Sequence, residues 1–225
     1  SGGEYYGGRY GLQLYGVEAL VEGVEAYGNN IGGIYASGNG TVVQDSLIRE
    51  NGDYGIYAST GVFVTGNTIF GHDDDTGDRG IQTSGAVVSE NEIYANSRGI
   101  EGSGEIRSNR IYGNTEEGIY SNGLSAIFDN VIYSNKVGIK TVAYASANDI
   151  VSNLIYENTD QGVWFNYGAN HRLVNNTIYQ SVGDALRVSG GSANVASYNN
   201  IFWIDTGQAY FVVSGSETGF ESDFN

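Results

Sequence analysis

The sequence contains no cysteine, no proline and no methionine among its 225 residues, and only two histidines. Without cysteine there is no disulfide framework, no thiolate metal site and no thiol nucleophile. Two histidines are too few for a multi-histidine zinc or iron site. Basic residues are also scarce, because 10 Lys and Arg oppose 26 Asp and Glu for a net charge of −16. This charge repels phosphate backbones and anionic lipids, so we expect neither nucleic acid nor a membrane surface as partner.

Long apolar runs are absent as well. No run approaches the roughly 18 residues that a membrane span requires, so we expect no membrane insertion. The chain begins at Ser1 and shows no basic-then-apolar signal segment, which we interpret as a processed or excised piece. Apolar residues still make up 40% of the chain, enough for a core. We therefore expect one folded domain over residues 1–225, in an extracellular or cell-surface setting.

An internal repeat runs through the whole chain. A Gly-Ile-like dipeptide marks coil starts near residues 11, 33, 55, 80, 99, 118, 138, 162, 185 and 209, with an average step of 22 residues. Between these dipeptides lies an Asn-x-Ile-Tyr phrase that begins at Asn67, Asn91, Asn109, Asn130, Asn153, Asn176 and Asn199, with a weaker copy at Asp45. A third apolar position precedes each Asn or Asp by three residues, at Val42, Val64, Val88, Ile106, Ile127, Ile150, Leu173 and Ala196.

Three short apolar segments per 22 residues, separated by Gly, Asn and Ser corners, indicate strands and not helices. The arithmetic predicts an all-β, right-handed, three-sided parallel β-helix (solenoid) of about ten coils. At a strand spacing of ~4.8 Å the rod is roughly 48 Å long. The Ile positions should stack inside the rod, and the glycine before each Ile should occupy a corner that needs positive φ.

A second Asn follows the first by five residues and should stack at a corner, where side-chain amides bond to one another and to turn backbone. It recurs at Asn96, Asn114, Asn135 and Asn158, with His72 and Ser181 as substitutes and Asn51 close to the same place. The absence of proline agrees with this pattern, because every coil donates N–H groups to its neighbour.

The repeated Gly-Ile and Asn-x-Ile-Tyr phrases resemble the right-handed parallel β-helix repeat of carbohydrate-processing and surface proteins. That superfamily includes mannuronan C5-epimerases, pectate lyases and polygalacturonases, and the resemblance covers residues 11–213. It implies the fold but no particular activity, since the repeated residues build the coil. The epimerase signature, Tyr-Gly-Phe-Asp-Pro-His-Glu, is absent. Fragments similar to polygalacturonase motifs, such as Asn158-Thr159-Asp160, occur in a scrambled order.

An acidic loop is inserted over residues 71–79 and breaks the repeat. Insertions in repeat proteins map to one face, which is often a binding face. Carboxylates there suit Ca²⁺, for which the candidate ligands are Asp53, Asp73, Asp75 and Asp78. The same loop also offers acid–base candidates, His72, Asp73 and Asp74. A solvated acidic loop with no ligand is the competing interpretation, and His171 lies too many coils away to cooperate with Asp73.

Two outward stripes of aromatic residues are predicted. The first follows the inward Ile of each phrase: Phe70, Tyr94, Tyr112, Tyr133, Tyr156, Tyr179 and Phe202. The second follows the Gly-Ile dipeptide: Gln13, Tyr35, Tyr57, Gln82, Glu101, Tyr120, Lys140, Trp164, Arg187 and Phe211. From these we select Tyr94, Tyr112, Tyr133, Tyr156, Tyr179, Trp164 and Tyr120 as candidate binding residues. Stacked rings also stabilise a sheet, so a purely structural role is the alternative.

Two hypotheses for function follow. The leading one is an extracellular structural or adhesive module that binds polysaccharide on an aromatic face or assembles end to end into a filament. Neither chain end shows an amphipathic helix that would cap the rod, so we expect either neighbouring domains of a longer chain or further rods as partners at the ends. The alternative is a polysaccharide-modifying enzyme, an epimerase or lyase, acting at the loop from His72 to Arg79. No complete catalytic signature is present, so the sequence favours the module.

Overall fold

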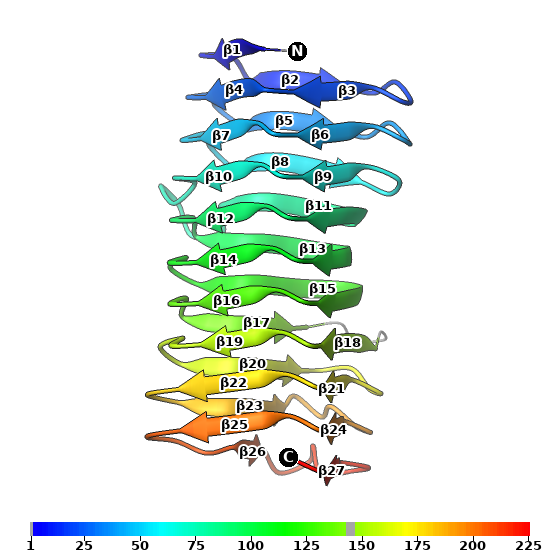
Figure 1. The fold of residues 1–225 in the computed structure, drawn as a ribbon, viewed down its shortest axis with the longest axis vertical. Helices are drawn as coiled ribbons and strands as arrows, with labels where there is room; N and C mark the ends of the chain where they lie inside the picture. The colour runs from blue at the N-terminus through cyan, green and yellow to red at the C-terminus, as the bar shows by residue number, and fades with distance from the viewer. Residues whose placement is uncertain (1, 143–146) are drawn as a thin grey trace.

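The computed structural model describes residues 2–142 and 147–225. Within these residues the regular elements are all β-strands, and the strand pairs are parallel. The strands stack coil upon coil along one axis, with the two chain ends at opposite ends of the rod (Figure 1). The predicted parallel β-helix is confirmed.

Each coil contributes one strand to each of three faces. The tyrosine face holds the Asn-x-Ile-Tyr phrases in β1 (Gly3–Tyr6), β4 (Val24–Tyr27), β7 (Leu47–Arg49), β10 (Thr68–Phe70), β12 (Glu92–Tyr94), β14 (Arg110–Tyr112), β16 (Val131–Tyr133), β19 (Leu154–Tyr156), β22 (Thr177–Gln180) and β25 (Ile201–Ile204). The Gly-Ile face is formed by β2 (Tyr10–Leu14), β5 (Gly32–Ala36), β8 (Tyr54–Ser59), β11 (Arg79–Ser89), β13 (Arg98–Arg107), β15 (Glu117–Phe128), β17 (Val137–Thr141), β20 (Gln161–Asn166), β23 (Asp184–Ser189) and β26 (Tyr210–Val212).

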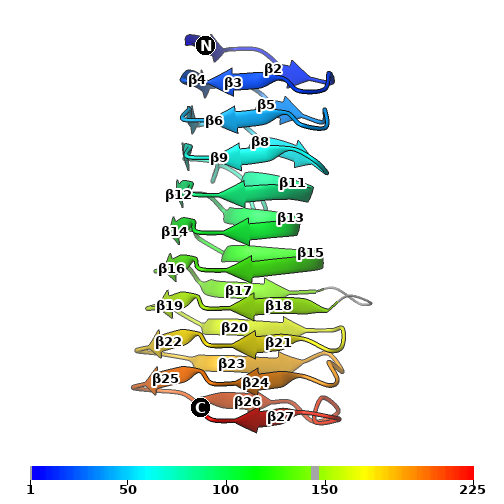
Figure 2. The same cartoon turned by 45° about the vertical axis from the view of Figure 1, so that its right-hand side comes forward.

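The third face is formed by shorter strands and by the second halves of three long ones. Its separate strands are β3 (Leu20–Glu22), β6 (Val42–Gln44), β9 (Phe63–Thr65), β18 (Asn148–Val151), β21 (Arg172–Val174), β24 (Ala196–Tyr198) and β27 (Glu221–Asp223). Between β9 and β18 the long strands β11, β13 and β15 continue from the Gly-Ile face onto this one. Figure 2 shows these strands as unbroken ribbons at the corner where other coils have a loop.

The isoleucines of the Asn-x-Ile-Tyr phrase form one inward ladder. Ile69 pairs with Ile93, and the ladder continues in register through Ile111, Ile132, Ile155 and Ile178. All six side chains are completely buried. Each coil therefore covers the apolar edge of its neighbour, which is how a solenoid builds one continuous core from short repeats.

The glycines of the Gly-Ile dipeptides have a different role from the predicted one. Their φ angles are not in the left-handed region. A Cβ at Gly118 would instead lie 2.8 Å from the carbonyl oxygen of Gly138 and 2.9 Å from both Ile132 Cγ2 and Asn135 Nδ2. The prediction of positive φ was wrong, and close packing between coils is the reason for glycine.

The left-handed conformation occurs at the residue before each ladder amide, for example Glu90, Ser108 and Asp129, with φ of 60°, 55° and 57°. The amide that follows is then aimed along the rod. Asn109 Nδ2 donates to Asn130 Oδ1 at 3.0 Å, and the Asn109 backbone N–H donates to the same oxygen. The polar corner is thus satisfied from coil to coil without water.

The second amide ladder runs along the corner between the tyrosine face and the Gly-Ile face. Its members are Asn29, Asn51, His72, Asn96, Asn114, Asn135, Asn158 and Gln180. His72 and Asn51 lie where the repeat predicted them. The choice of Ser181 was wrong, because Gln180 Oε1 accepts the Asn158 N–H at 3.1 Å, and Asn29 was not predicted.

Two coils are shifted by one residue from the predicted phase. Ser46, and not Asp45, bonds to Asn67, so Val43 is buried in place of Val42. At the C-terminal end Asn200 replaces Asn199 in the ladder and Ser197 replaces Ala196 inside. Phe202 therefore pairs with Ile178 and packs against the core, while Trp203 takes the outward place next to Tyr179.

Candidate functional site

The outward aromatic residues of the tyrosine face form a stack, which we name the tyrosine stripe. It consists of Tyr6, Tyr27, Phe70, Tyr94, Tyr112, Tyr133, Tyr156, Tyr179 and Trp203, with Arg49 between Tyr27 and Phe70. From Phe70 to Tyr156 neighbouring ring centroids are 4.8–5.0 Å apart and the planes are within 11° of parallel. Arg49 continues the stack, with its guanidinium carbon 4.2 Å from the centroid of Tyr27.

This geometry limits what the middle of the stripe can bind. Parallel rings at this spacing cover one another's faces, so Tyr94, Tyr112 and Tyr133 present mainly ring edges to solvent. Several hydroxyls are engaged too: Tyr112 donates to Glu92 at 3.0 Å, and Arg110 donates to the Tyr133 oxygen at 2.7 Å. Burial, together with Glu92, raises the pKa of Tyr112 to about 12. The middle of the stripe has the geometry of a sheet-stabilising ladder.

The stack breaks at its C-terminal end and leaves a pocket. The rings of Tyr179 and Trp203 meet edge to face, at 67° with centroids 5.7 Å apart. Together with Leu154 and Tyr156 they line an apolar depression of about 450 Å³. Trp203 is 69% exposed, so much of the indole is open to solvent. We name this depression the aromatic pocket.

A carboxylate is fixed at the rim of the aromatic pocket. Trp203 Nε1 donates to Asp205 Oδ1 at 3.1 Å, and the Tyr179 hydroxyl donates to Asp205 Oδ2 at 2.9 Å. Asp205 follows the end of β25 and is exposed. A carboxylate has about four acceptor sites, so Asp205 keeps capacity for hydroxyl donors from a ligand. Trp203 was missed from the sequence because the last coil is shifted by one residue, and Asp205 because it follows the strand and belongs to no repeated position.

The acidic insertion lies between β10 and β11, at the corner that carries the second amide ladder (Figure 1). Several of its carboxylates bond within the loop itself. Asp78 Oδ2 accepts the Asp75 N–H at 2.8 Å, and Asp75 Oδ1 accepts the Thr76 N–H at 2.7 Å. Asp53 is exposed one coil away, and its carbonyl accepts the Arg79 N–H at 3.1 Å. Asp73 is exposed at the loop surface.

Asp74 and Asp78 form a carboxyl pair in this loop. Asp78 is buried, and burial together with a hydrogen bond from its side chain to Asp74 raises the pKa of Asp78 to about 6. A carboxyl group that titrates near neutrality beside a second carboxyl group has the properties of an acid–base pair.

Neither histidine is on the surface. His72 is fully buried in the amide ladder, with Nδ1 2.8 Å from Asn96 Oδ1 and Nε2 3.2 Å from Asn51 Nδ2, and burial lowers its pKa to about 4. The structure thus separates His72 from the exposed Asp73 and Asp74 with which it was grouped. His171 is also buried, accepts the Asn148 N–H at Nδ1 and stacks on Phe165, and burial lowers its pKa.

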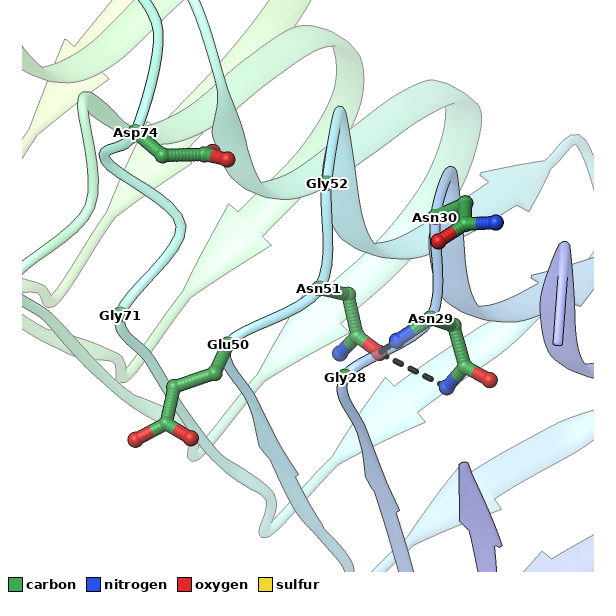
Figure 3. A pocket seen from close by; sticks show the side chains of 8 residues that line it. All are labelled: Gly28, Asn29, Asn30, Glu50, Asn51, Gly52, Gly71 and Asp74. Carbon is green, nitrogen blue, oxygen red and sulfur yellow. Dashed lines mark hydrogen bonds between the residues drawn. The ribbon is translucent and has the colours of Figure 1, made fainter. Parts of the chain in front are cut away.

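Three cavities follow one another along the corner that carries the insertion. They measure about 470, 230 and 540 Å³; the first two share Asp74 and the last two share Thr115. Figure 3 shows the first, with the hydrogen-bonded pair Asn29 and Asn51 at one side of the cavity and Glu50 and Asp74 at the other. The corner is therefore a polar groove.

The Gly-Ile face carries the other two candidate binding residues and a chain of ion pairs. All ten outward positions of this stripe match the predicted register. Arg98 bonds to both Glu101 and Glu117, at 2.7 and 2.9 Å, and Lys140 bonds to Glu117 at 3.0 Å. The Arg98 guanidinium lies over Tyr120, 4.2 Å from its centroid, and the Lys140 ammonium lies 4.5 Å from the centroid of Trp164.

Over residues 2–142 and 147–225, no group of three or more His, Asp or Glu side chains is gathered to hold a metal ion. The predicted ligands Asp53, Asp73, Asp75 and Asp78 thus do not form a metal cluster there, and calcium binding stays a prediction. In the same part of the chain no helix has the length and apolar character to cross a membrane.

The family is shown by a match to the family model described as "Right handed beta helix region", over residues 5–154 and 102–202. The chain belongs to this family, and the resemblance inferred from its repeats is confirmed. No curated protein matches the sequence.

Three solved structures share the fold of this chain, and two of them are named as mannuronan epimerases. The A-module of mannuronan C-5 epimerase AlgE4 from Azotobacter vinelandii superposes with a TM-score of 0.65 at 16% identity, covering 92% of this chain and 64% of that one. DFA-IIIase from Arthrobacter chlorophenolicus A6, without its lid, superposes with a TM-score of 0.65 at 13% identity, and the match covers 87% of this chain and 62% of that one. The A-module of mannuronan C-5 epimerase AlgE6 from A. vinelandii superposes with a TM-score of 0.59 at 17% identity, and the match covers 91% of this chain and 64% of that one. The chain spans less than two thirds of each, and at these identities the likeness establishes the fold alone.

Proposed function

We propose that this β-helix is an extracellular polysaccharide-binding module whose binding site is the aromatic pocket. The observation that carries the proposal is the exposure of Trp203 beside Leu154, Tyr156 and Tyr179. A pyranose ring has an apolar face of C–H groups and a rim of hydroxyls. The pocket offers the matching surfaces, because it is mostly apolar with one carboxylate, Asp205, held at its edge.

Charge indicates which sugars this pocket accepts. The Tyr179 hydroxyl and Trp203 Nε1 both donate to Asp205, which fixes a carboxylate at the rim of the pocket. A uronate placed there would meet like charge, whereas the hydroxyls of a neutral sugar donate to the carboxylate oxygens. The proposed ligand of the aromatic pocket is therefore a neutral glycan.

Retention on insoluble glycans tests this function. We expect the protein to be retained on at least one member of a panel of neutral glucans, mannans and xylans, and Trp203→Ala to weaken retention at least tenfold. Phe224→Ala is the matched control, because Phe224 is an aromatic residue that is 81% exposed outside the pocket. Equal retention of Trp203→Ala and Phe224→Ala contradicts the proposal.

A second candidate function is polysaccharide modification at the insertion. It is supported by the Asp74–Asp78 carboxyl pair and by the groove that passes beside it. His72 takes no part in this version, because it is fully buried. Product release from neutral and uronate polysaccharides, measured for the wild type and for Asp74→Asn, tests it; turnover that survives the substitution eliminates the pair as the catalytic group. End-to-end assembly, the other part of our sequence-based hypothesis, stays a prediction.

A further inference from the structure

One basic residue on the Gly-Ile face has no acidic partner among residues 2–142 and 147–225. Of the ten Lys and Arg residues, eight form ion pairs with a carboxylate in the part of the chain that the structure describes. The two others are Arg9, which is exposed at the N-terminal end, and Arg187 in β23. In a protein with 26 acidic residues, a partly buried arginine without a carboxylate is unexpected.

Arg187 is held between two aromatic rings. Its guanidinium carbon lies 5.4 Å from the centroid of Trp164 and 4.9 Å from that of Phe211, on the strands to either side. The Arg187 Nε atom is buried and has no hydrogen-bond partner among the described residues. Asp184, the carboxylate of the same strand, instead accepts the Gln208 N–H at 3.1 Å. Because Nε is closed off from solvent, an acceptor from outside can reach only the two terminal guanidinium nitrogens, which are not among the buried atoms and form no ion pair in the described part of the chain.

The ring beside Arg187 is fixed in place. Trp164 Nε1 donates to Ser189 Oγ at 2.7 Å, and Ser189 in turn donates to Asn166 Oδ1 at 3.1 Å. The ammonium of Lys140 lies over Trp164 as well, 4.5 Å from its centroid. Trp164 is thus flanked by strands that carry two cations, Lys140 and Arg187, and only Lys140 is neutralised, by Glu117.

We propose that Arg187, Trp164 and Phe211 form a binding site for the carboxylate of an acidic sugar. A guanidinium presents parallel N–H donors that match the two oxygens of a carboxylate. Cations already lie over the Trp164 ring, so Trp164 and Phe211 offer the sugar ring their outward edges on either side of the guanidinium. The overall negative charge does not prevent this, because exposed charges more than about 8 Å away are largely screened at physiological ionic strength. The site is on a different face from the aromatic pocket and does not depend on the proposed function.

The tryptophan content allows a direct test. The chain has two tryptophans, so in a Trp203→Phe background the emission reports on Trp164 alone. We expect titration with glucuronate to change this emission saturably, with weaker binding as NaCl is raised, and titration with glucose to have no effect. Arg187→Gln should weaken glucuronate binding at least tenfold. Arg187→Lys should recover only part of it, because the charge returns without the paired donors.

Arg9→Gln is the matched control, because it removes the other unpaired arginine and should leave the titration unchanged. The thermal unfolding of each variant shows that it is folded. The proposal is overturned if Arg187→Gln binds glucuronate as the parent does, or if glucose binds equally well. It is also overturned if acetate and an acidic peptide titrate as well as glucuronate, because the site then recognises a carboxylate without the sugar.

Discussion

Tyr133 and Trp203 occupy the same outward position of the tyrosine face, three coils apart, and they have different surroundings. Tyr133 is sandwiched between parallel rings 4.9 and 4.8 Å away. Trp203 meets Tyr179 edge to face and is 69% exposed. Where the repeat is regular, neighbouring rings cover one another's faces, and this stacking stabilises the sheet. Aromatic surface becomes available to a ligand where the repeat is interrupted.

The largest expected effect concerns the regular part. Gly118→Ala places a Cβ 2.8 Å from a backbone oxygen of the next coil, which cannot move without disturbing the ladder. We expect a loss of about 3 kcal/mol in the free energy of unfolding, at the upper end for overpacking, measured by denaturant titration. Gly16→Ala is the control, since a Cβ there meets no atom within 4 Å and φ is not in the left-handed region. Equal losses in both variants would show that the close approach between coils is unimportant.

The second expected effect is a pH dependence of stability caused by His72, which titrates whereas the amides beside it in the ladder do not. Its pKa is about 4 in the folded protein, against 6.5 normally. The unfolded chain therefore binds a proton between pH 6.5 and 4 that the folded protein does not bind, and stability falls as the pH falls through this window. His72→Asn restores the residue type of the regular ladder. As the pH is lowered from 7 to 4, we expect the free energy of unfolding of His72→Asn to rise by on the order of 2 kcal/mol relative to that of the wild type.

Asp78 is expected to have the opposite pH dependence. Its pKa of about 6 is above the usual 3.8, so the folded protein binds the proton more tightly. This contribution to stability is present below pH 3.8 and is lost as the pH rises to 6. Compared with the wild type, Asp78→Asn should thus be relatively more stable at pH 7 than at pH 4. Unfolding curves at both pH values check this, and a pH-independent difference would mean that folding does not raise the pKa of Asp78.

The smallest stability effect is expected in the irregular part. Trp203→Leu removes a largely exposed ring, so we expect a change within about 0.5 kcal/mol, typical of surface substitutions. Tyr133→Leu removes two stacked contacts, for which we expect a loss of about 1–3 kcal/mol at the usual worth of an aromatic pair. Thermal unfolding of the two variants under one condition makes the comparison, and a larger loss for Trp203→Leu would reverse our assignment of roles.

The fold was predictable because its determinants repeat. Ile93 and its equivalents recur in phase often enough to fix the number of faces, the register of the middle coils and the inward ladder. The errors arose where the identity of a single residue sets the phase of a coil. Asn199 and Asn200 are adjacent amides, and the pattern alone did not show which one continues the ladder. The aromatic pocket was missed for the same reason, since the shift that exposes Trp203 also turns Phe202 inward.

In our interpretation, Trp203 contributes to ligand binding and Tyr133 contributes to the stability of the fold. The most direct measurement is retention on the neutral glycan that the wild type binds, with Trp203→Leu and Tyr133→Leu compared at a temperature where both are folded. We expect Trp203→Leu to lose at least tenfold in retention and Tyr133→Leu to keep the wild-type value. Equal retention of the two variants, or a greater loss for Tyr133→Leu, would contradict it.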